Sequence, residues 1–124
     1  MATQMRAMNE TSAMVLCERL EVAETVAEQS RGLLGRDGLK PDEGMLFETG
    51  RFTPFMWMHM FFMRFAIDIV FLDKSDRVLR INHRLKPWRF SSMVFGARRA
   101  LELEAGAAAR SGTVEGDQLE LTGD

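Results

Sequence analysis

The most apolar stretch of the chain, residues 55–73, restricts the possible folds more than any other segment. Within it, residues 61–72 are apolar at both odd and even positions, and Arg64 and Asp68 are the charged exceptions. A strand with one solvent-facing side would alternate apolar and polar residues, so this run predicts a central strand that is covered on both faces. The β-branched and aromatic content of residues 65–71 supports that prediction.

The first part of the same stretch permits a second structure. Met56, Met60 and Met63 have the spacing of one helical face, so a helix over residues 56–63 remains an alternative to a strand. The uninterrupted apolar run, residues 55–62, is much shorter than the ~20 residues that a membrane-spanning helix needs. We therefore expect no membrane segment here.

Shorter apolar segments and turns surround this stretch. Strands are predicted at residues 14–22, 45–47, 78–82, 97–103 and 118–121. Short helices are predicted at residues 25–34, which begin with a capping box, and at residues 105–111, which are rich in alanine. Because most connections are short turns, we expect an α+β domain with two short helices and a mainly antiparallel sheet of five to seven strands. Such a sheet would be curved or partly closed into a barrel.

Length and cysteine content indicate a single cytoplasmic domain. The chain has 124 residues; we place the domain at residues 13–122 and expect the polar residues 1–12 to be disordered. Cys17 is the only cysteine, so the chain has neither a disulfide framework nor a cysteine metal cluster. Residues 1–11 contain no apolar segment or cleavage site of a signal peptide, which indicates a cytoplasmic location.

Charge is unevenly distributed along the chain. The net charge is −2, yet residues 51–99 hold ten basic and three acidic side chains. Residues 1–50 hold five basic and nine acidic side chains, and residues 100–124 hold one and six. The basic middle would either pair with the acidic ends when the chain folds, which we prefer, or bind an anionic partner.

Asp68 lies among aliphatic residues, where an ionised carboxylate is costly unless it is paired or hydrogen-bonded. Our preferred interpretation is a structural acceptor of backbone or arginine donors that locks the sheet to a loop. The alternative is a ligand-facing or proton-transfer group with a perturbed pKa. Arg64 is four residues away, or ~13 Å along a straight strand, so Arg31 or Arg36 is the more suitable partner.

A cluster of soft ligands precedes the central strand. Met56, Met58, His59 and Met60 lie beside Trp57, and thioethers with imidazole suit Cu(I). Methionine also fills irregular core space well, and that is the interpretation we prefer for these residues. We therefore expect no metal and no cofactor, with Cu(I) as an alternative.

Residues 77–99 form a basic zone with interspersed aromatic rings. Its cations are Arg77, Arg80, Arg84, Lys86, Arg89, Arg98 and Arg99, and its rings are His83, Trp88 and Phe90. Cations between stacking rings are typical of single-stranded nucleic-acid surfaces, although the acidic balance of the whole chain disfavours that function. The chain lacks the GxSxG, HExxH, P-loop and GxGxxG motifs, so no standard hydrolase, protease or nucleotide site is indicated.

Several separated motifs occur together in one order, at residues 31–36, 44–47, 59–73, 87–88, 101–106 and 116–119. With these motifs the chain resembles the uncharacterised bacterial and archaeal family catalogued as domain of unknown function 192. The resemblance implies a compact α+β domain with a curved, barrel-like sheet, and it implies no established activity. The recurrent polar positions of the family fall here on Arg31, Arg36, His59, Arg64 and Asp68. Ala66 stands where relatives often have a proline.

These observations predict a small, soluble binding or accessory domain for a small anionic ligand or an acidic partner segment. Arg31, Arg36 and Arg64 would supply the hydrogen-bond donors. His59 and Trp88 would shape the site, and Asp68 would orient an arginine. The alternative is an enzyme in which His59 and Asp68 act as a general acid–base pair within hydrogen-bond reach of each other.

Overall fold

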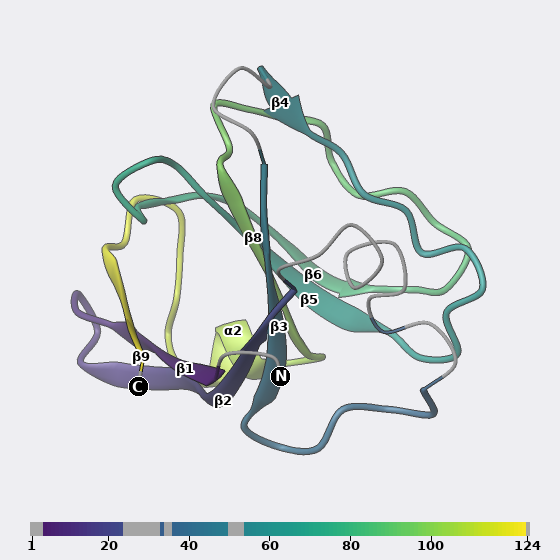
Figure 1. Ribbon diagram of the computed structural model, residues 1–124, viewed down its shortest axis with the longest axis horizontal. Helices are drawn as coiled ribbons and strands as arrows, with labels where there is room; N and C mark the ends of the chain where they lie inside the picture. The colour runs from purple at the N-terminus through teal and green to yellow at the C-terminus, as the bar shows by residue number, and fades with distance from the viewer. Residues whose placement is uncertain (1–3, 24–32, 34–35, 50–53, 124) are drawn as a thin grey trace.

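A curled sheet of seven strands forms the centre of the protein (Figure 1). The computed structural model describes residues 4–23, 33, 36–49 and 54–123. In spatial order the strands are β6 (Val78–Leu85), β5 (Ile67–Leu72), β8 (Arg99–Glu104), β3 (Glu43–Glu48), β2 (Met14–Val22), β1 (Gln4–Asn9) and β9 (Leu119–Gly123). A separate two-stranded sheet pairs β4 (Phe55–Met56) with β7 (Val94–Phe95), and helix α2 spans Ala107–Arg110.

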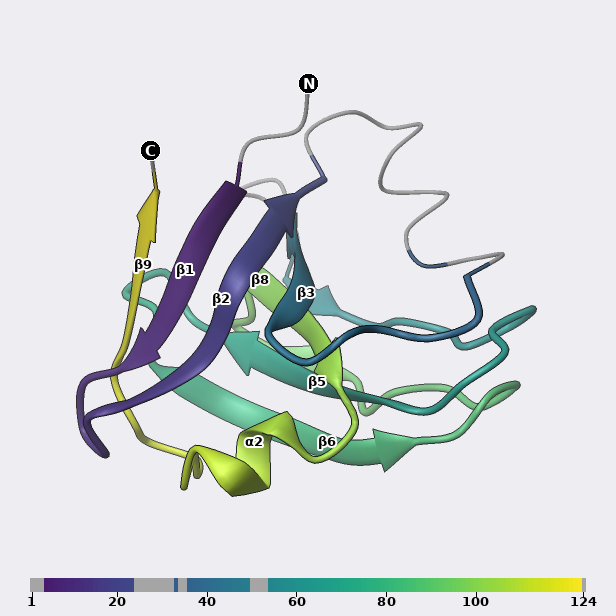
Figure 2. The same cartoon turned by 90° about the horizontal axis from the view of Figure 1, so that it is seen from below.

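The seven-stranded sheet curls into a half-barrel, as Figure 2 shows. Its two edge strands approach each other at one end, where Arg77 and Gln118 form an isolated bridge. Beside that bridge the Val78 N–H donates to the Asp117 carbonyl at 2.8 Å, and the Gly116 N–H donates to the Val78 carbonyl at 2.8 Å. The prediction of a curved, partly closed sheet is therefore confirmed.

The sheet is mixed, which amends the prediction of a mainly antiparallel sheet. Strands β2 and β3 run parallel, whereas the other neighbouring strands of the described sheet are antiparallel. Parallel neighbours need a long crossover connection. Residues 23–42 join these two strands, and the expected helix at residues 25–34 lies almost wholly in the part of the chain that the structure does not describe.

Strand β5 is buried at all six positions and confirms the prediction of a strand covered on both faces. Val70 and Leu72 point into the curl of the sheet, while Ile67, Ile69 and Phe71 point outward. The strand begins at Ile67 and is shorter than the predicted run. The preceding residues instead join the two-stranded arm described below, since backbone pairing with a distant segment outweighs local strand propensity there.

Apolar side chains form two cores, one on each side of the sheet. The inner core, inside the curl, consists mainly of aliphatic residues and includes the alanines of α2. The outer core contains Met45, Met56, Met60 and Met63 at or below 6% exposure, so the methionines pack as core residues. Methionine suits this layer because its flexible side chain fills the irregular space between a sheet and loops.

A long two-stranded projection, which we call the aromatic arm, consists of residues 54–63 and 86–96 (Figure 1). Backbone hydrogen bonds join its two segments. At one end the Gly96 N–H donates to the Pro54 carbonyl at 3.0 Å, and at the other end the Trp88 N–H donates to the Met60 carbonyl at 2.8 Å. The extended pairing excludes the helix that was an alternative for residues 56–63. The inner side of the arm covers the outer core.

The N-terminal prediction is corrected by β1. Residues 4–9, within the segment expected to be disordered, form a strand between β2 and β9. The Asn9 side chain is fully buried, and its Nδ2 donates to Asp117 Oδ2 at 2.9 Å and to Thr113 Oγ1 at 3.0 Å. Pairing with a strand on each side orders this segment, although its polar composition suggested disorder.

Helix α2 occupies only the middle of the predicted helix at residues 105–111. Among the described residues, no helix is long and apolar enough to cross a membrane.

Candidate functional site

Asp68 is a structural residue in this fold. Its side chain is fully buried. Oδ1 accepts the Arg84 backbone N–H at 2.8 Å, and Oδ2 accepts the N–H groups of Gly106 and Ala108 at 3.1 and 3.0 Å. These bonds tie β5 to the end of β6 and to the start of α2, as the preferred interpretation of Asp68 predicted. No guanidinium of a described residue bonds this carboxylate; Arg31, one of the arginines predicted to be its partner, lies outside the described residues.

Gly106 makes this arrangement possible. Its φ of 96° lies in the left-handed region, which directs its N–H toward the aspartate at little conformational cost. A Cβ at this position would lie 2.9 Å from the Arg84 Nη2 atom. The glycine at the end of the motif at residues 101–106 is therefore required by the Asp68 contacts.

The predicted arginines lie apart from Asp68. Arg64 forms an exposed ion pair with Asp37, with 2.8 Å between Nη1 and Oδ1. Arg36 pairs with Glu21 at 3.5 Å. Arg31 lies outside the described residues. The structure confirms the sequence argument that Arg64 and Asp68 are not partners. The suggestion that Arg36 is the partner of Asp68 is wrong, because Arg36 pairs with Glu21.

His59 and Trp88 come together on the aromatic arm. His59 bridges to Phe90 on the opposite strand, and its Nδ1 accepts the Phe61 N–H at 3.2 Å. The Trp88 ring lies 5.9 Å from the Phe61 ring between centroids. His59 is exposed while Asp68 is sealed by its backbone donors, and no hydrogen bond of the described residues joins the two. The structure does not bring the alternative acid–base pair together.

Met56, Met58 and Met60 share one side of the arm strand and pack against the outer core, as their spacing predicted. His59 points to the other side and is exposed. The alternation separates the imidazole from the thioethers, so the four Cu(I) ligands do not converge. Among the described residues, no group of three or more His, Cys, Asp or Glu side chains is placed to hold a metal.

The outer side of the arm carries a continuous series of aromatic rings. Successive centroid distances are 4.7 Å for Trp57–Phe90, 5.0 Å for Phe90–Phe61, 5.9 Å for Phe61–Trp88 and 4.8 Å for Trp88–Phe62. Phe62 is 69% exposed and Trp88 is 56% exposed, and Trp57 and Phe90 are each about half exposed. Sequence analysis named Trp88 and Phe90 among the rings of the basic zone and Trp57 beside the methionines, but it missed Phe61 and Phe62, because it assigned residues 61–72 to a buried strand.

Most basic side chains of residues 51–99 have no acidic partner among the described residues. Arg99 pairs with Asp76 at 3.2 Å and with Glu48 at 3.7 Å, and Arg77 donates to the Gly116 carbonyl. Within the described part of the chain, the cations without an ion pair include Arg80, Arg84, Lys86, Arg89 and Arg98. Among the described residues, the preferred expectation that the acidic ends neutralise this zone is fulfilled only by Arg64–Asp37 and Arg99–Glu48.

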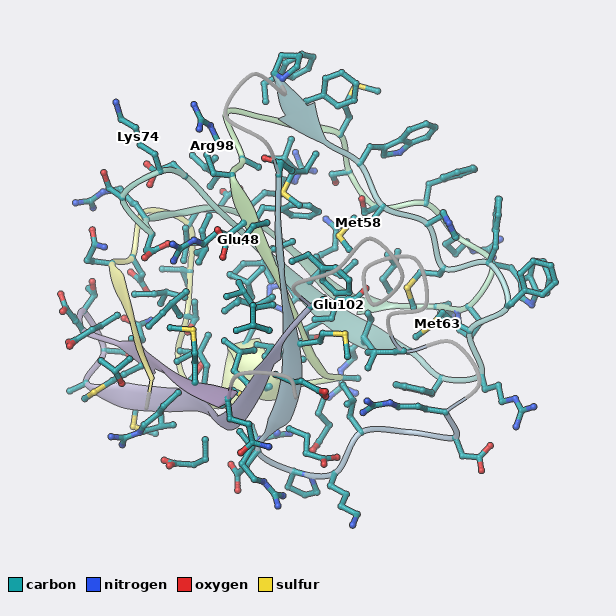
Figure 3. All side chains as sticks on the ribbon, in the orientation of Figure 1. Glu48, Met58, Met63, Lys74, Arg98 and Glu102 are labelled. Carbon is teal, nitrogen blue, oxygen red and sulfur yellow. The ribbon has the colours of Figure 1, made fainter. Side chains whose placement is uncertain are left out.

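Glu102 is a candidate that the sequence analysis did not identify. It is 6% exposed on β8, and its register neighbours are Met45 on β3 and Ile69 on β5. No hydrogen bond or ion pair reaches it from any described residue, and burial raises the pKa of its carboxyl to about 7. Figure 3 labels it near the centre of the view. The sequence does contain a signal for the burial of Glu102. It lies two residues after the buried Ala100, and residues two apart in a strand share one face.

Cys17 is unsuited to nucleophilic chemistry. Its buried thiol donates to the Asp42 carbonyl, with 3.2 Å between Sγ and O. Burial raises the pKa of the thiol to about 11. Because the thiolate is the nucleophile, this cysteine is inert at neutral pH.

Two hollows in the described surface lie away from the predicted site residues. One, of about 430 Å³, is lined by Arg80, Ile81, His83, Thr113, Val114 and Glu115. The other, of about 260 Å³, lies between β1, β2 and β9. Neither is lined by Arg36, His59, Arg64, Asp68 or Trp88, so these residues do not converge on either hollow.

Comparisons with known proteins agree with the resemblance in the sequence. The family model DUF192, described as Uncharacterized ACR, matches residues 7–121. A UPF0127 protein from Thermococcus sibiricus is 29% identical over 119 residues, which cover 90% of this chain and 71% of that protein.

Two solved structures share the fold. One, a protein of unknown function from Novosphingobium aromaticivorans, has a TM-score of 0.78 and 30% identity, covering 96% of this chain and 84% of that one. The other, a protein from Sinorhizobium meliloti provisionally described as a transcription regulator, has a TM-score of 0.80 and 25% identity. That alignment covers 97% of this chain and 93% of the other.

Proposed function

This chain belongs to the DUF192 family of uncharacterized proteins, and we propose that it is a non-catalytic binding domain whose aromatic arm holds an acidic, extended segment of a partner protein. The observation that carries the proposal is the series of exposed rings on the outer side of the arm. Monomeric soluble proteins rarely expose contiguous apolar surface without an interaction to cover it. Aromatic residues are also the side chains that contribute most at such interfaces.

The charge around the rings favours an acidic partner. Lys86 and Arg89 lie in the same segment of the arm as Trp88 and Phe90, are exposed, and have no ion pair within the described residues. Arg64 follows Phe62 and is held only by the exposed Asp37. Exposed ion pairs contribute little stability, so a partner carboxylate can replace Asp37 at low cost.

The shape of the arm favours an extended segment over a small anionic ligand. A small ligand usually occupies a concave pocket that buries most of its surface. The rings instead follow one another along the arm, and Arg36 and Arg64 line neither of the described hollows. An extended peptide suits such a surface because alternate side chains reach the rings while its backbone follows the arm.

Catalysis has weaker support. Both oxygens of Asp68 are occupied by backbone donors, and the pKa of Cys17 is raised to about 11 by burial. A general acid–base pair or an activated nucleophile needs its two groups within hydrogen-bond reach. No such pair occurs among the described residues of the arm.

Intrinsic fluorescence offers a direct test, because the chain has two tryptophans and both, Trp57 and Trp88, lie on the arm. The protein is titrated at low salt with a peptide that alternates glutamate and leucine, and with a matched peptide that contains lysine in place of glutamate. We expect saturable binding of the acidic peptide only, weakened by added salt. Phe62→Ala should weaken it about tenfold and Arg89→Ala about threefold.

Val114→Ala is the matched control, because Val114 is also an exposed apolar residue but lies far from the arm in sequence. It should leave the affinity unchanged. Equal binding of both peptides, or unchanged binding in Phe62→Ala, would reject the arm as the site of an acidic segment.

A single-stranded nucleic acid is the second candidate ligand. The stacked Trp57 and Phe90 rings, with Arg89 between Trp88 and Phe90, have the composition of a base-stacking surface. The relative from Sinorhizobium meliloti, provisionally described as a transcription regulator, adds support for this candidate. The acidic net charge disfavours it. Competition by a short single-stranded oligonucleotide that displaces the acidic peptide at equal concentration would favour nucleic acid.

A further inference from the structure

The opening of the half-barrel, between its two edges, holds the larger of the two hollows in the described surface. Strand β6 and the chain that leads into β9 meet at the Arg77–Gln118 bridge (Figure 2). Beyond Val78, no hydrogen bond of the described residues joins them. The hollow, of about 430 Å³, lies there, between residues 80–83 of β6 and residues 113–115. Its volume is within the range of pockets that bind small molecules.

Residues 113–115 form a preorganised wall of this hollow. Thr113 is 2% exposed, and its Oγ1 accepts a hydrogen bond from Asn9 Nδ2 at 3.0 Å. The Val114 N–H donates to Asp117 Oδ2 at 3.0 Å. Because these bonds hold the wall before any ligand arrives, a ligand in the hollow would not have to order it, and less conformational entropy would be lost on binding.

The opposite wall is the free edge of β6. Its neighbour in the sheet is β5, and no backbone hydrogen bond outside that pairing reaches residues 79–83 from the described part of the chain. Residues of an antiparallel strand direct their N–H and C=O groups alternately toward and away from the partner strand. This wall therefore offers unpaired backbone donors and acceptors to a ligand in the hollow.

Charged side chains of both signs line the hollow without pairing. Arg80 and His83 lie on the β6 wall and Glu115 on the opposite wall, and all three are exposed. None of them forms an ion pair or a side-chain hydrogen bond within the described residues. Ile81, which packs against the inner core, and Val114 add apolar surface. The lining thus combines a cationic side, an acidic side and aliphatic groups.

We propose that this hollow binds an α-amino acid with an aliphatic side chain. Arg80 and His83 donate to the ligand carboxylate, and Glu115 accepts from its ammonium group. The aliphatic side chain contacts Ile81 and Val114. A zwitterion matches the lining better than a simple anion, which would leave Glu115 beside a like charge, or a simple cation, which would do the same to Arg80. The site shares no residue with the aromatic arm, so it goes beyond the proposed binding of an acidic segment.

Compounds of related shape test this charge pattern by isothermal titration calorimetry at neutral pH and low salt. L-Leucine carries both charges and an isobutyl group. 4-Methylpentanoate lacks the ammonium group, 3-methylbutylamine lacks the carboxylate, and glycine lacks the aliphatic side chain. We expect leucine to bind about tenfold more tightly than each of the others, since each of them has lost one kind of contact.

Substitutions in the two walls locate the site. Arg80→Gln and Glu115→Gln should each weaken leucine binding about tenfold, and both should fold because both residues are exposed. Arg80→Gln should also remove the advantage of leucine over 3-methylbutylamine, and Glu115→Gln its advantage over 4-methylpentanoate. Arg19→Gln is the matched control, because Arg19 is an exposed arginine on β2, which does not neighbour β6. It should leave leucine binding unchanged.

Two further variants separate this site from the aromatic arm. Val114→Ala should weaken leucine binding about threefold and leave the acidic-peptide titration unchanged, whereas Phe62→Ala should show the reverse pattern. No leucine binding, or equal binding of 4-methylpentanoate or 3-methylbutylamine, would overturn the amino-acid site. Full leucine affinity in both Arg80→Gln and Glu115→Gln would overturn it as well. A failed peptide titration beside normal leucine binding would reject the arm alone.

Discussion

Asp68 and Glu102 are two buried carboxylates on adjacent strands with opposite surroundings. In the β5–β8 ladder, Asp68 pairs with Leu103, and Glu102 pairs with Ile69, the residue after Asp68. Because successive positions of a strand point to opposite faces, the two acids lie on opposite faces of the same sheet. Asp68 accepts three backbone N–H groups, whereas no described residue donates to Glu102. The pKa of Glu102 is raised by burial alone.

The difference shows that burial by itself does not decide whether an acid stabilises a fold. Asp68 faces the place where β6 ends and α2 begins, and both supply amide groups that have no other partner. Glu102 faces methionines and aliphatic side chains, which have no hydrogen to donate. The inner acid therefore holds the structure together, whereas no described residue compensates the outer acid.

The largest effect is expected from Asp68→Asn. An amide keeps one acceptor oxygen and turns an NH₂ group toward backbone donors, so one or two of the three buried N–H groups lose their partner. We expect unfolding to become easier by about 3–5 kcal/mol, since hydrogen bonds to a charged group contribute roughly 1.5–3 kcal/mol each. Urea denaturation followed by circular dichroism measures this change.

Asp37→Asn is the control for that measurement, because Asp37 is 91% exposed and pairs only at the surface. Its free energy of unfolding should stay within about 1 kcal/mol of wild type. If Asp68→Asn were no more destabilising than Asp37→Asn, the structural role of the buried aspartate would be disproved.

Glu102→Gln is expected to have the opposite sign. The folded-state pKa of about 7 lies above the usual 4.5, so the folded protein binds the proton more tightly than the unfolded chain does. Stability therefore falls as pH rises from about 4.5 to 7 and stays low above that range. At pH 8 the glutamine variant should be more stable than wild type by about 3 kcal/mol, from 1.36 kcal/mol per pKa unit.

The sign of the pH dependence checks this interpretation. The advantage of Glu102→Gln should shrink toward zero between pH 7 and pH 4.5, when urea midpoints of both proteins are compared. A glutamine variant that is less stable than wild type at pH 8 would mean that the carboxylate has a favourable partner in solution.

The smallest effect is expected at the exposed ion pair between Asp37 and Arg64. A double-mutant cycle with Arg64→Ala and Asp37→Ala should give a coupling free energy below about 1 kcal/mol that declines with added salt. Chemical denaturation of the four proteins measures it. A coupling of 2 kcal/mol or more would show that this pair fixes the arm, and would count against its release to a partner.

The sequence predicted several elements closely. The strand at residues 14–22 matches β2, and the doubly apolar run contains β5, because period and composition record which faces are buried. The arm was misjudged because its inner methionines and outer rings are both apolar. Periodicity of hydrophobicity cannot distinguish a ring that covers a core from a ring that faces solvent.

At the candidate site, too, the sequence predicted some features and missed others. Sequence reasoning identified Asp68 as a buried acid needing donors, and it excluded Arg64 by distance. It left open whether the donors were backbone groups or an arginine such as Arg31 or Arg36, and the observed donors are backbone groups at sequence separations of 16, 38 and 40 residues. Backbone amides are common to every residue, so no residue type in the sequence marks them as partners.

Sequence alone determined the family, the buried strand β5 and the methionine-rich core, because these depend on the local order of apolar residues. Tertiary structure decided which acid is satisfied, which acid is left without a donor, and which rings remain in solvent. Those outcomes depend on where distant loops come to rest against the sheet. A carboxylate gains or loses several kcal/mol according to whether two or three N–H groups point at it, and only the folded chain fixes their direction.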